Sequence, residues 1–475
     1  MVVLVICCSS LFIVGLDSTV VTVALPVIGH DLHASVAGLQ WIIDGYVLVL
    51  ACLLMLSGAT ADRVGRRRVF QVGLAVFTAG SGLCSLAPGL GWLIAFRMVQ
   101  AVGGSMLNPV AMSIITNTFT DRAERARAIG VWGGVYGLSV ALGPVLGGLL
   151  VDTIGWRGAF WINIPIGIAA IALTARFVPE SKAPVARRPD VVGQALLVAM
   201  LGSLTYAIIE GPTLGWHASV ILALFVMAAV SCAAFAGYEA RRAIPVLDPR
   251  FFRSAPFAGS VLTAITAFAA MAGFLFLATL YLQDARGESA LRAGLHIMPM
   301  AIIMAPGAVV SSRILARRGA RLPMLASGLG LAAGGVLLSR LTIASPTWPI
   351  VIAFCVLGIG AGMVNPPITY AAVSGMPTTQ AGVASSIAST SRQVGQSLGV
   401  AVTGSILAAS LHGPLRAGFV PASHAAWLLL AACGGAVFLL GLVTTGRWAL
   451  GTAARTAARY DDATGPKTAV TTQTG

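Results

Sequence analysis

Residues 37–87 read AGLQWIIDGYVLVLACLLMLSGATADRVGRRRVFQVGLAVFTAGSGLCSLA. Two apolar runs, 37–58 and 69–87, flank a short turn that contains Asp62 and a run of arginines ending at Arg68. A helix needs roughly 20 apolar residues to cross the hydrocarbon core of a bilayer. Both runs approach or reach that length, so this stretch predicts two membrane-spanning helices joined by a basic turn.

The whole chain has the composition of an integral membrane protein. Of its 475 residues, 57% are hydrophobic and only 10% are charged, whereas soluble domains carry about 25% charged residues. Breaks at polar, Pro/Gly-rich or Arg-rich segments divide the chain into apolar runs of membrane-spanning length. These runs predict fourteen helices, at 2–28, 37–58, 69–87, 90–116, 127–150, 157–178, 190–211, 217–238, 257–282, 291–313, 322–341, 347–371, 381–409 and 424–447.

The net charge of +14 comes mainly from short loops between the apolar runs. Cytoplasmic loops of membrane proteins are enriched in Lys and Arg. A cytoplasmic N-terminus places the strongly basic loops inside the cell, namely those with Arg66, Arg125, Arg187, Arg242 and Arg317. We therefore expect a multi-pass plasma-membrane protein with both termini in the cytoplasm. Because the basic clusters lack interleaved aromatic residues, they do not indicate nucleic-acid binding.

A short basic turn occurs twice, after the second predicted helix (Asp62–Arg68) and after the tenth (Arg313–Arg321). Such a repeat is typical of transporters built from two similar halves. The chain is therefore divided into two six-helix bundles, a linker with two further helices and a polar tail expected to be disordered in the cytoplasm. The two bundles are residues 1–178 and 257–447, the linker is residues 179–256 and the tail is residues 448–475.

Five motifs resemble signatures of one known family. Gly58–Arg68 resembles the loop between helices two and three of the major facilitator superfamily. Leu16–Pro26 resembles the helix-one motif of its fourteen-helix drug:proton antiporters, and Gly137–Gly148 resembles the helix-five antiporter motif of its exporters. Arg97–Gly104 and Trp156–Pro165 are similar to motifs in helices four and six of the same family.

This resemblance implies the major facilitator fold, an all-α membrane protein of two six-helix bundles, here with two extra central helices. It also implies a secondary active transporter that works by proton antiport with alternating access. The expected cargo is drugs or other small, often cationic or amphipathic, molecules that are exported. A proton-coupled importer or a metabolite exporter of the same fold is the alternative.

Ionisable groups inside membrane helices are costly unless they pair or line a cavity, which makes them functional candidates. Asp17, Asp44 and Arg97 are predicted at comparable depths in the outer halves of helices one, two and four. One arginine can keep one carboxylate charged while the other binds and releases a proton. We therefore predict that these three residues couple transport to protons and leave open which aspartate carries the proton. The structural alternatives are a hydrogen bond within the helix for Asp17, an interfacial position for Asp44 and a static ion pair for Arg97.

Two motifs are predicted to have conformational roles. In the basic loop, an acid can complement a helix dipole and arginines can pair with acids or lipid headgroups. The expected latch, which could instead simply anchor the loop, consists of Gly58, Asp62, Arg63, Gly65, Arg66 and Arg67. In helix five, glycines allow close helix approach and proline bends the helix, which serves packing or hinge motion. These residues are Gly137, Gly143, Pro144, Gly147 and Gly148.

Three further polar residues are candidates for a substrate cavity: Gln100, Glu210 and Arg392. Glu210 is also well placed as an interface or cap residue, and Arg392 could pair with backbone carbonyls instead. The chain has no G-x-x-x-x-G-K-[ST] motif, so no ATP site is expected. Without hydrolase or metal-binding motifs, no enzyme activity, cofactor or metal site is expected either. The expected partners are a small-molecule substrate, protons and the lipid bilayer, and we expect the chain to function as a monomer.

Overall fold

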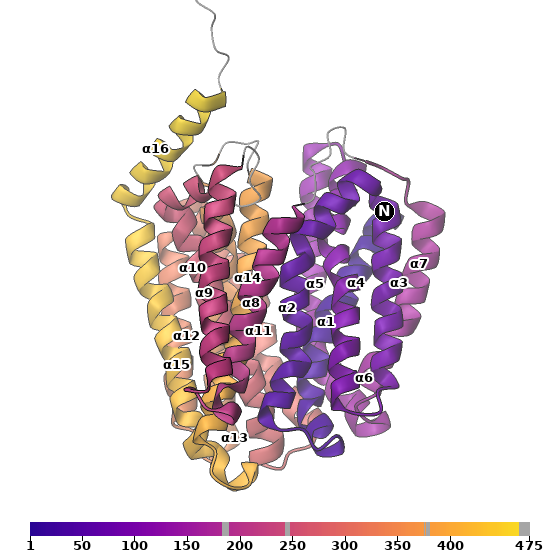
Figure 1. Ribbon diagram of the computed structural model, residues 1–475, viewed down its shortest axis with the longest axis vertical. Coiled ribbons are helices and arrows are strands. Elements are labelled where there is room, and N and C mark those ends of the chain that lie inside the picture. Colours follow the sequence, from indigo (N-terminus) through magenta and orange to yellow (C-terminus); the bar gives the residue numbers. More distant parts are fainter. Residues whose placement is uncertain (183–189, 243–247, 375, 377–380, 465–475) are drawn as a thin grey trace, which may run out of the picture.

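The computed structural model describes residues 1–182, 190–242, 248–374, 376 and 381–464, and these residues form a bundle of long helices (Figure 1). The first group of helices packs around α1, α2 and α4. It consists of α1 (Val2–Asp31), α2 (Val36–Val64), α3 (Arg66–Ser85), α4 (Leu90–Thr118), α5 (Arg122–Ile154), the short α6 (Gly158–Trp161) and α7 (Asn163–Phe177).

A second group packs through the helix pairs α10/α14, α11/α13 and α12/α15. It consists of α10 (Ala255–Leu280), which continues into the π-helical turn η2 (Tyr281–Ala285), α11 (Ala290–Arg318), α12 (Arg321–Ser339), α13 (Thr347–Val373), α14 (Ala381–Ser410) and α15 (Leu415–Thr444). Between the groups, α8 and α9 pack on each other, and α8 also lies against α2 and α14. Their bounds are Val191–Leu214 and Ser219–Arg241, followed by the 3-10 turn η1 (Pro249–Arg253).

Helix ends are fixed by local chemistry that hydropathy does not show. Asp121 accepts hydrogen bonds from the N–H groups of Ala123 and Glu124, so α5 begins several residues before its apolar run. Gly65 has a positive φ of 131° and separates α2 from α3. In the same way, Gly413 has a φ of 86° just before α15, which begins earlier than predicted.

Each predicted apolar run coincides with a helix, but not every one of these helices is long and apolar enough to count as a candidate membrane crossing. In the part of the chain that the structure describes, twelve helical segments are long and apolar enough to cross a membrane. α3 and α14 are not among them, because α3 begins with three arginines and α14 carries many serines and Arg392. The fold is therefore all-helical with twelve candidate spans, and the fourteen-helix count is not confirmed.

The tail also differs from its predicted disorder, because Arg447–Thr464 forms a further helix, α16. Its sequence is rich in alanine, the best helix former. Ala449 and Ala453 are buried, and the hydroxyl of Thr452 accepts a hydrogen bond from the N–H of Ala255 at the start of α10. Residues 465–475 lie outside the described part of the chain.

The two groups of helices meet most closely at the end of the bundle opposite the N-terminus and α16 (bottom of Figure 1). The carboxylate of Asp152, at the end of α5, accepts hydrogen bonds from the N–H groups of Ala290 (3.2 Å) and Leu291 (3.0 Å), which begin α11. His30 in α1 contacts Asp284 in η2 at 2.8 Å. These contacts seal one end of the interface between the halves.

Candidate functional site

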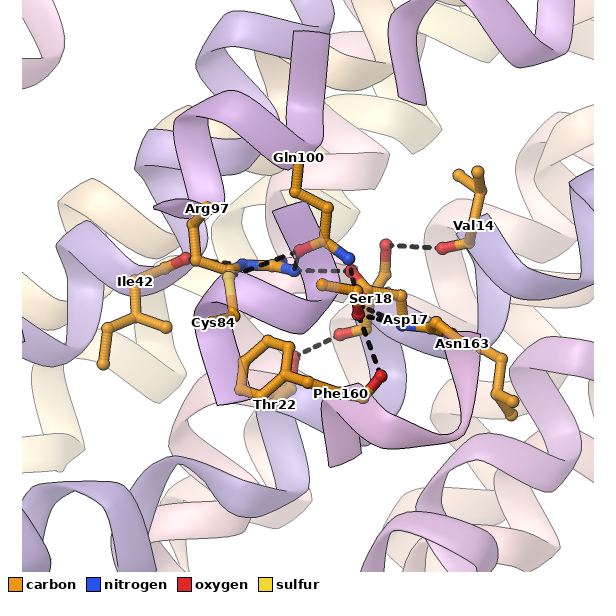
Figure 2. Close-up of polar contacts among 12 residues, drawn as sticks. Val14, Asp17, Ser18, Thr22, Ile42, Cys84, Arg97, Gln100, Phe160 and Asn163 are labelled. Atoms are coloured by element: carbon orange, nitrogen blue, oxygen red, sulfur yellow. Dashed lines mark hydrogen bonds and ion pairs between the residues drawn. The ribbon is translucent and has the colours of Figure 1, made fainter. Parts of the chain in front are cut away.

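Asp17 is the centre of a buried polar network contributed by three helices (Figure 2). α1 supplies Asp17, α4 supplies Arg97 and Gln100, and α7 supplies Asn163 at its first residue. One oxygen of Asp17 contacts the Arg97 guanidinium at 2.5 Å. The other accepts hydrogen bonds from the side-chain amides of Gln100 and Asn163, both at 2.9 Å. The network therefore ties α1, α4 and α7 together.

Arg97 is held on several sides. Its guanidinium donates to the side-chain oxygen of Gln100 at 2.7 Å and lies 4.1 Å from the ring centre of Tyr46 in α2. Its side chain and that of Asp17 are 2% and 0% exposed. A buried charge is tolerated when a counter-charge and hydrogen bonds replace water, and both conditions are met here. Asp17 and Arg97 therefore form a buried ion pair in this structure.

Asp44 does not join this network, although a shared role with Asp17 and Arg97 was predicted. It is fully buried in α2, on the side where α2 packs against α14. The Ser397 hydroxyl of α14 is close enough to influence the carboxyl, but neither Asp44 oxygen has a hydrogen-bond partner among the residues that the structure describes. Asp44 is thus a buried carboxyl group without a cation at the interface between the halves.

The predicted latch loop is bound within the first half. Asp62 pairs with Arg66 at 2.9 Å. The carboxylate of Glu180, just after α7, accepts a hydrogen bond from the N–H of Arg67 at 3.1 Å and packs directly against Gly65, where any side chain would collide with it. Of the other predicted latch residues, Gly58 faces α4 and Arg63 is exposed.

The glycines of the helix-five motif serve different contacts. A side chain at Gly143 or Gly147 would collide with α1, and one at Gly148 would collide with the start of α11 in the other half. A side chain on Gly294 of α11 would collide with the carbonyl of Pro144. Gly137, by contrast, faces open space. The motif therefore brings α5 into close contact with both halves near the sealed end.

The three candidate cavity residues are not brought together. Gln100 is fully buried in the Asp17 network. Glu210 accepts a hydrogen bond from the indole N–H of Trp41 at 2.8 Å, which links α8 to α2 as an interface residue would. Arg392 lies in α14, and among the described residues it hydrogen-bonds only to neutral groups, Asn365 of α13 and Ser389 of its own helix.

Two residues of the site were not among the predicted functional residues. Asn163 lies within a quoted family motif, but its contact with Asp17 joins residues 146 positions apart in sequence. Glu180 follows an apolar run and carries no local signal, since its role arises only where α7 ends beside the basic loop. Both depend on tertiary packing.

Comparisons with known proteins give a consistent family. A family model described as Major Facilitator Superfamily matches residues 7–400. The multidrug resistance protein Stp of Mycobacterium tuberculosis is 37% identical over 406 residues, which cover 86% of this chain and 75% of that protein. The methylenomycin A resistance protein of Streptomyces coelicolor is 37% identical over 394 residues, covering 82% of each chain.

The fold is similar to that of solved transporters. The crystal structure of the peptide transporter POT in complex with alafosfalin matches with a TM-score of 0.67, covering 96% of this chain and 95% of that one. Sequence identity is only 15%, so this likeness concerns the fold alone.

The Asp17–Arg97 pair generates a stability prediction. Asp17→Asn leaves a buried guanidinium without its counter-charge, which should cost about 3–5 kcal/mol. The double variant Asp17→Asn/Arg97→Gln removes both charges and should recover most of the loss. The measurement is the thermal midpoint of detergent-solubilised protein by fluorescence-detected gel filtration, with Asp62→Asn in the half-exposed pair as control. A single variant as stable as the wild type, or a double variant no better than the single, would contradict a structural ion pair.

Proposed function

The chain belongs to the Major Facilitator Superfamily, and on that premise we propose that it exports drugs or similar small molecules across the plasma membrane in exchange for protons. The names of its relatives support export, since two are named for multidrug and methylenomycin A resistance. Import by the same fold is the alternative, and neither of these names supports it. Alternating access requires the two halves to rock about a site between them.

Asp44 is the observation that carries the proton-coupling part of the proposal. A carboxylate without a cation is strongly disfavoured in an apolar interior. Asp44 is therefore protonated in this conformation, whereas Asp17 has Arg97 as a fixed counter-ion. Proton release requires water to reach Asp44, and separation of α2 from α14 would provide it. This difference favours Asp44 over Asp17 as the proton carrier.

Asp44→Asn should fold and bind cargo but should lose coupling, because an amide mimics only the protonated acid. In inside-out vesicles with an acidified lumen, we expect dye uptake driven by the pH gradient to fall at least about tenfold, the loss of a step worth roughly 1.4 kcal/mol or more. Asp31→Asn, an exposed carboxylate of the same half, is the matched control and should behave as wild type. Gradient-driven uptake that survives in Asp44→Asn would exclude Asp44 as the carrier.

We also propose that the basic loop is a conformational latch, with Glu180 as its partner in the state described. The loop is engaged by Glu180 and the end of α7, while the halves are joined at the opposite end of the bundle. When the halves close at the end that carries the loop, the loop arginines become available to acids or helix ends of the second half. Contacts that differ between two states bias their equilibrium without touching cargo.

Glu180→Gln tests the latch because it removes the charge that holds Arg67 and Arg68. We expect the transport rate to change by about threefold or more, given the strength of charge-assisted hydrogen bonds, with an unchanged Kd for the transported dye. Glu124→Gln, an exposed acid in the first turn of α5, serves as control. A Kd that weakens in parallel with the rate would place the loop on the binding route and contradict the latch.

Finally, we propose that α3 and α14 also cross the membrane, which gives fourteen crossings and cytoplasmic termini. α3 packs along α4 and α7, and α14 packs along α10 and α2, so both are covered by candidate spans. A helix with polar residues can span a bilayer when these face the protein interior. Their lower hydropathy is therefore compatible with a crossing.

Single cysteines in a cysteine-free chain test these two crossings. Arg68→Cys lies at the start of α3, and Met376→Cys lies before α14. Both cysteines should react with a membrane-impermeant maleimide only in inside-out vesicles. Leu86→Cys and His412→Cys should react only in intact cells. If both members of either pair reacted from the same side, the corresponding helix would not cross.

A further inference from the structure

Arg392 is an interior cation without a carboxylate partner. It lies in the middle of α14, and its guanidinium donates to the hydroxyl of Ser389 at 2.7 Å and to the side-chain oxygen of Asn365 at 3.2 Å. Among the residues that the structure describes, no acid lies within ion-pair distance of it. This is the opposite of Arg97, whose charge is fully matched by Asp17.

The surroundings of Arg392 are open rather than packed. Asn365 is exposed although it lies well inside α13, and Arg392 itself is half-buried. On α1, Ser18 is the one exposed residue between Ile6 and Gly29. Tyr136 of α5 is 38% exposed. Exposed polar groups in the middle of helices indicate a water-accessible space between the halves, as expected around a substrate site at mid-membrane depth.

Aromatic groups flank this space. The Tyr136 ring lies beside Gly15 of α1, where an added Cβ would be 3.1 Å from it, and Tyr136 lies in the neighbourhood of Arg392. Phe268 of α10 also lies near Arg392, with its ring centre 6.0 Å from the guanidinium carbon. A cation near aromatic rings of both halves combines a site for negative charge with faces for ring stacking.

We infer that Arg392 binds the acidic group of an aromatic organic anion, a carboxylate or a phenolate, in the cavity between the halves. This inference rests on the proposed export function and names its cargo class. A guanidinium matches a planar carboxylate through paired N–H donors, and the bond is strengthened where water is scarce. The other interior charges do not oppose an anion, because Asp17 is neutralised by Arg97 and Asp44 is protonated in this state.

Two dyes with a common xanthene ring system test the sign of the charge. Fluorescein carries a carboxylate and is an anion at neutral pH, whereas rhodamine 123 is a methyl ester and a cation. The wild type should bind and export fluorescein in preference to rhodamine 123. Arg392→Gln should weaken the Kd for fluorescein by about tenfold or more, the range of a hydrogen bond to a charged group, and should change the Kd for rhodamine 123 less than about twofold.

Asn365→Asp provides a second variant that retains the arginine. A carboxylate at this position would pair with Arg392 and occupy it, so fluorescein binding should fall as in Arg392→Gln. Arg392→Lys keeps the charge without the planar fork and should be intermediate. Arg340→Gln, which removes an exposed arginine after α12, is the charge-matched control and should leave both dyes unaffected.

The outcomes separate this inference from the proposed function. Equal loss of both dyes in Arg392→Gln, or export of rhodamine 123 but not fluorescein by the wild type, would overturn the anion site and leave export intact. If the wild type is present in the membrane and moves neither dye, the proposed export function fails together with the inference. If Arg392→Gln does not reach the membrane, Asn365→Asp decides, and unchanged fluorescein binding in that variant would also overturn the site.

Discussion

A charge inside a membrane protein must be paired, neutralised or matched by a ligand, and this constraint organises the interior of the molecule. Asp17 and Arg97 satisfy it in this structure through an ion pair with hydrogen bonds to every carboxylate oxygen. Asp44 has no cation partner among the described residues, and we propose that it satisfies the constraint as the neutral acid. Within the described part of the chain, Arg392 hydrogen-bonds only to neutral groups, and its partner Asn365 is exposed. The three solutions correspond to the three roles proposed above: a structural tie, a proton site and a site for cargo.

The structural tie has consequences for the packing of the first half. Because Asp17 is bonded to α4 and α7, α1 is held as a central helix with almost no exposed surface. The glycines of α5 then allow this helix to approach α1 on one face and α11 of the other half on another face. Contacts between the halves, including the hydrogen bond between Asp152 of α5 and the start of α11, close the end opposite the N-terminus. The α2/α14 contact is a place where relative movement of the halves would reach the buried carboxyl group of Asp44.

Helix positions could be predicted from sequence because the length of an apolar run is a local property. All the predicted runs coincide with helices, and the errors lie at the ends, where caps such as Asp121 and Gly413 decide. The tail was mispredicted because an Ala-rich helix with a small buried face, Ala449 and Ala453, reads as a polar segment. The site was only partly predictable. Asp17 and Arg97 were correctly identified as interior charges, but which groups meet depends on helix packing. Asn163, Glu180 and Asn365 acquire their roles only from neighbours far away in the sequence, and Asp44 faces α14 rather than Arg97.

One helix, α14, takes part in both the proposed proton site and the proposed cargo site. Ser397 of α14 lies beside Asp44, and Arg392 is less than two turns away on the same helix. Two ligands exchange when both bias the equilibrium of one two-state element, and we propose that α14, which contacts α2 as well as α10, is such an element. An anion that leaves the cell while a proton enters moves positive charge inward in both steps. Each charge that crosses an inside-negative membrane gains about 2.3 kcal/mol per 100 mV. Exchange of an anion for a proton would therefore draw on the membrane potential twice, whereas one-for-one exchange of a monovalent cation would not draw on it at all.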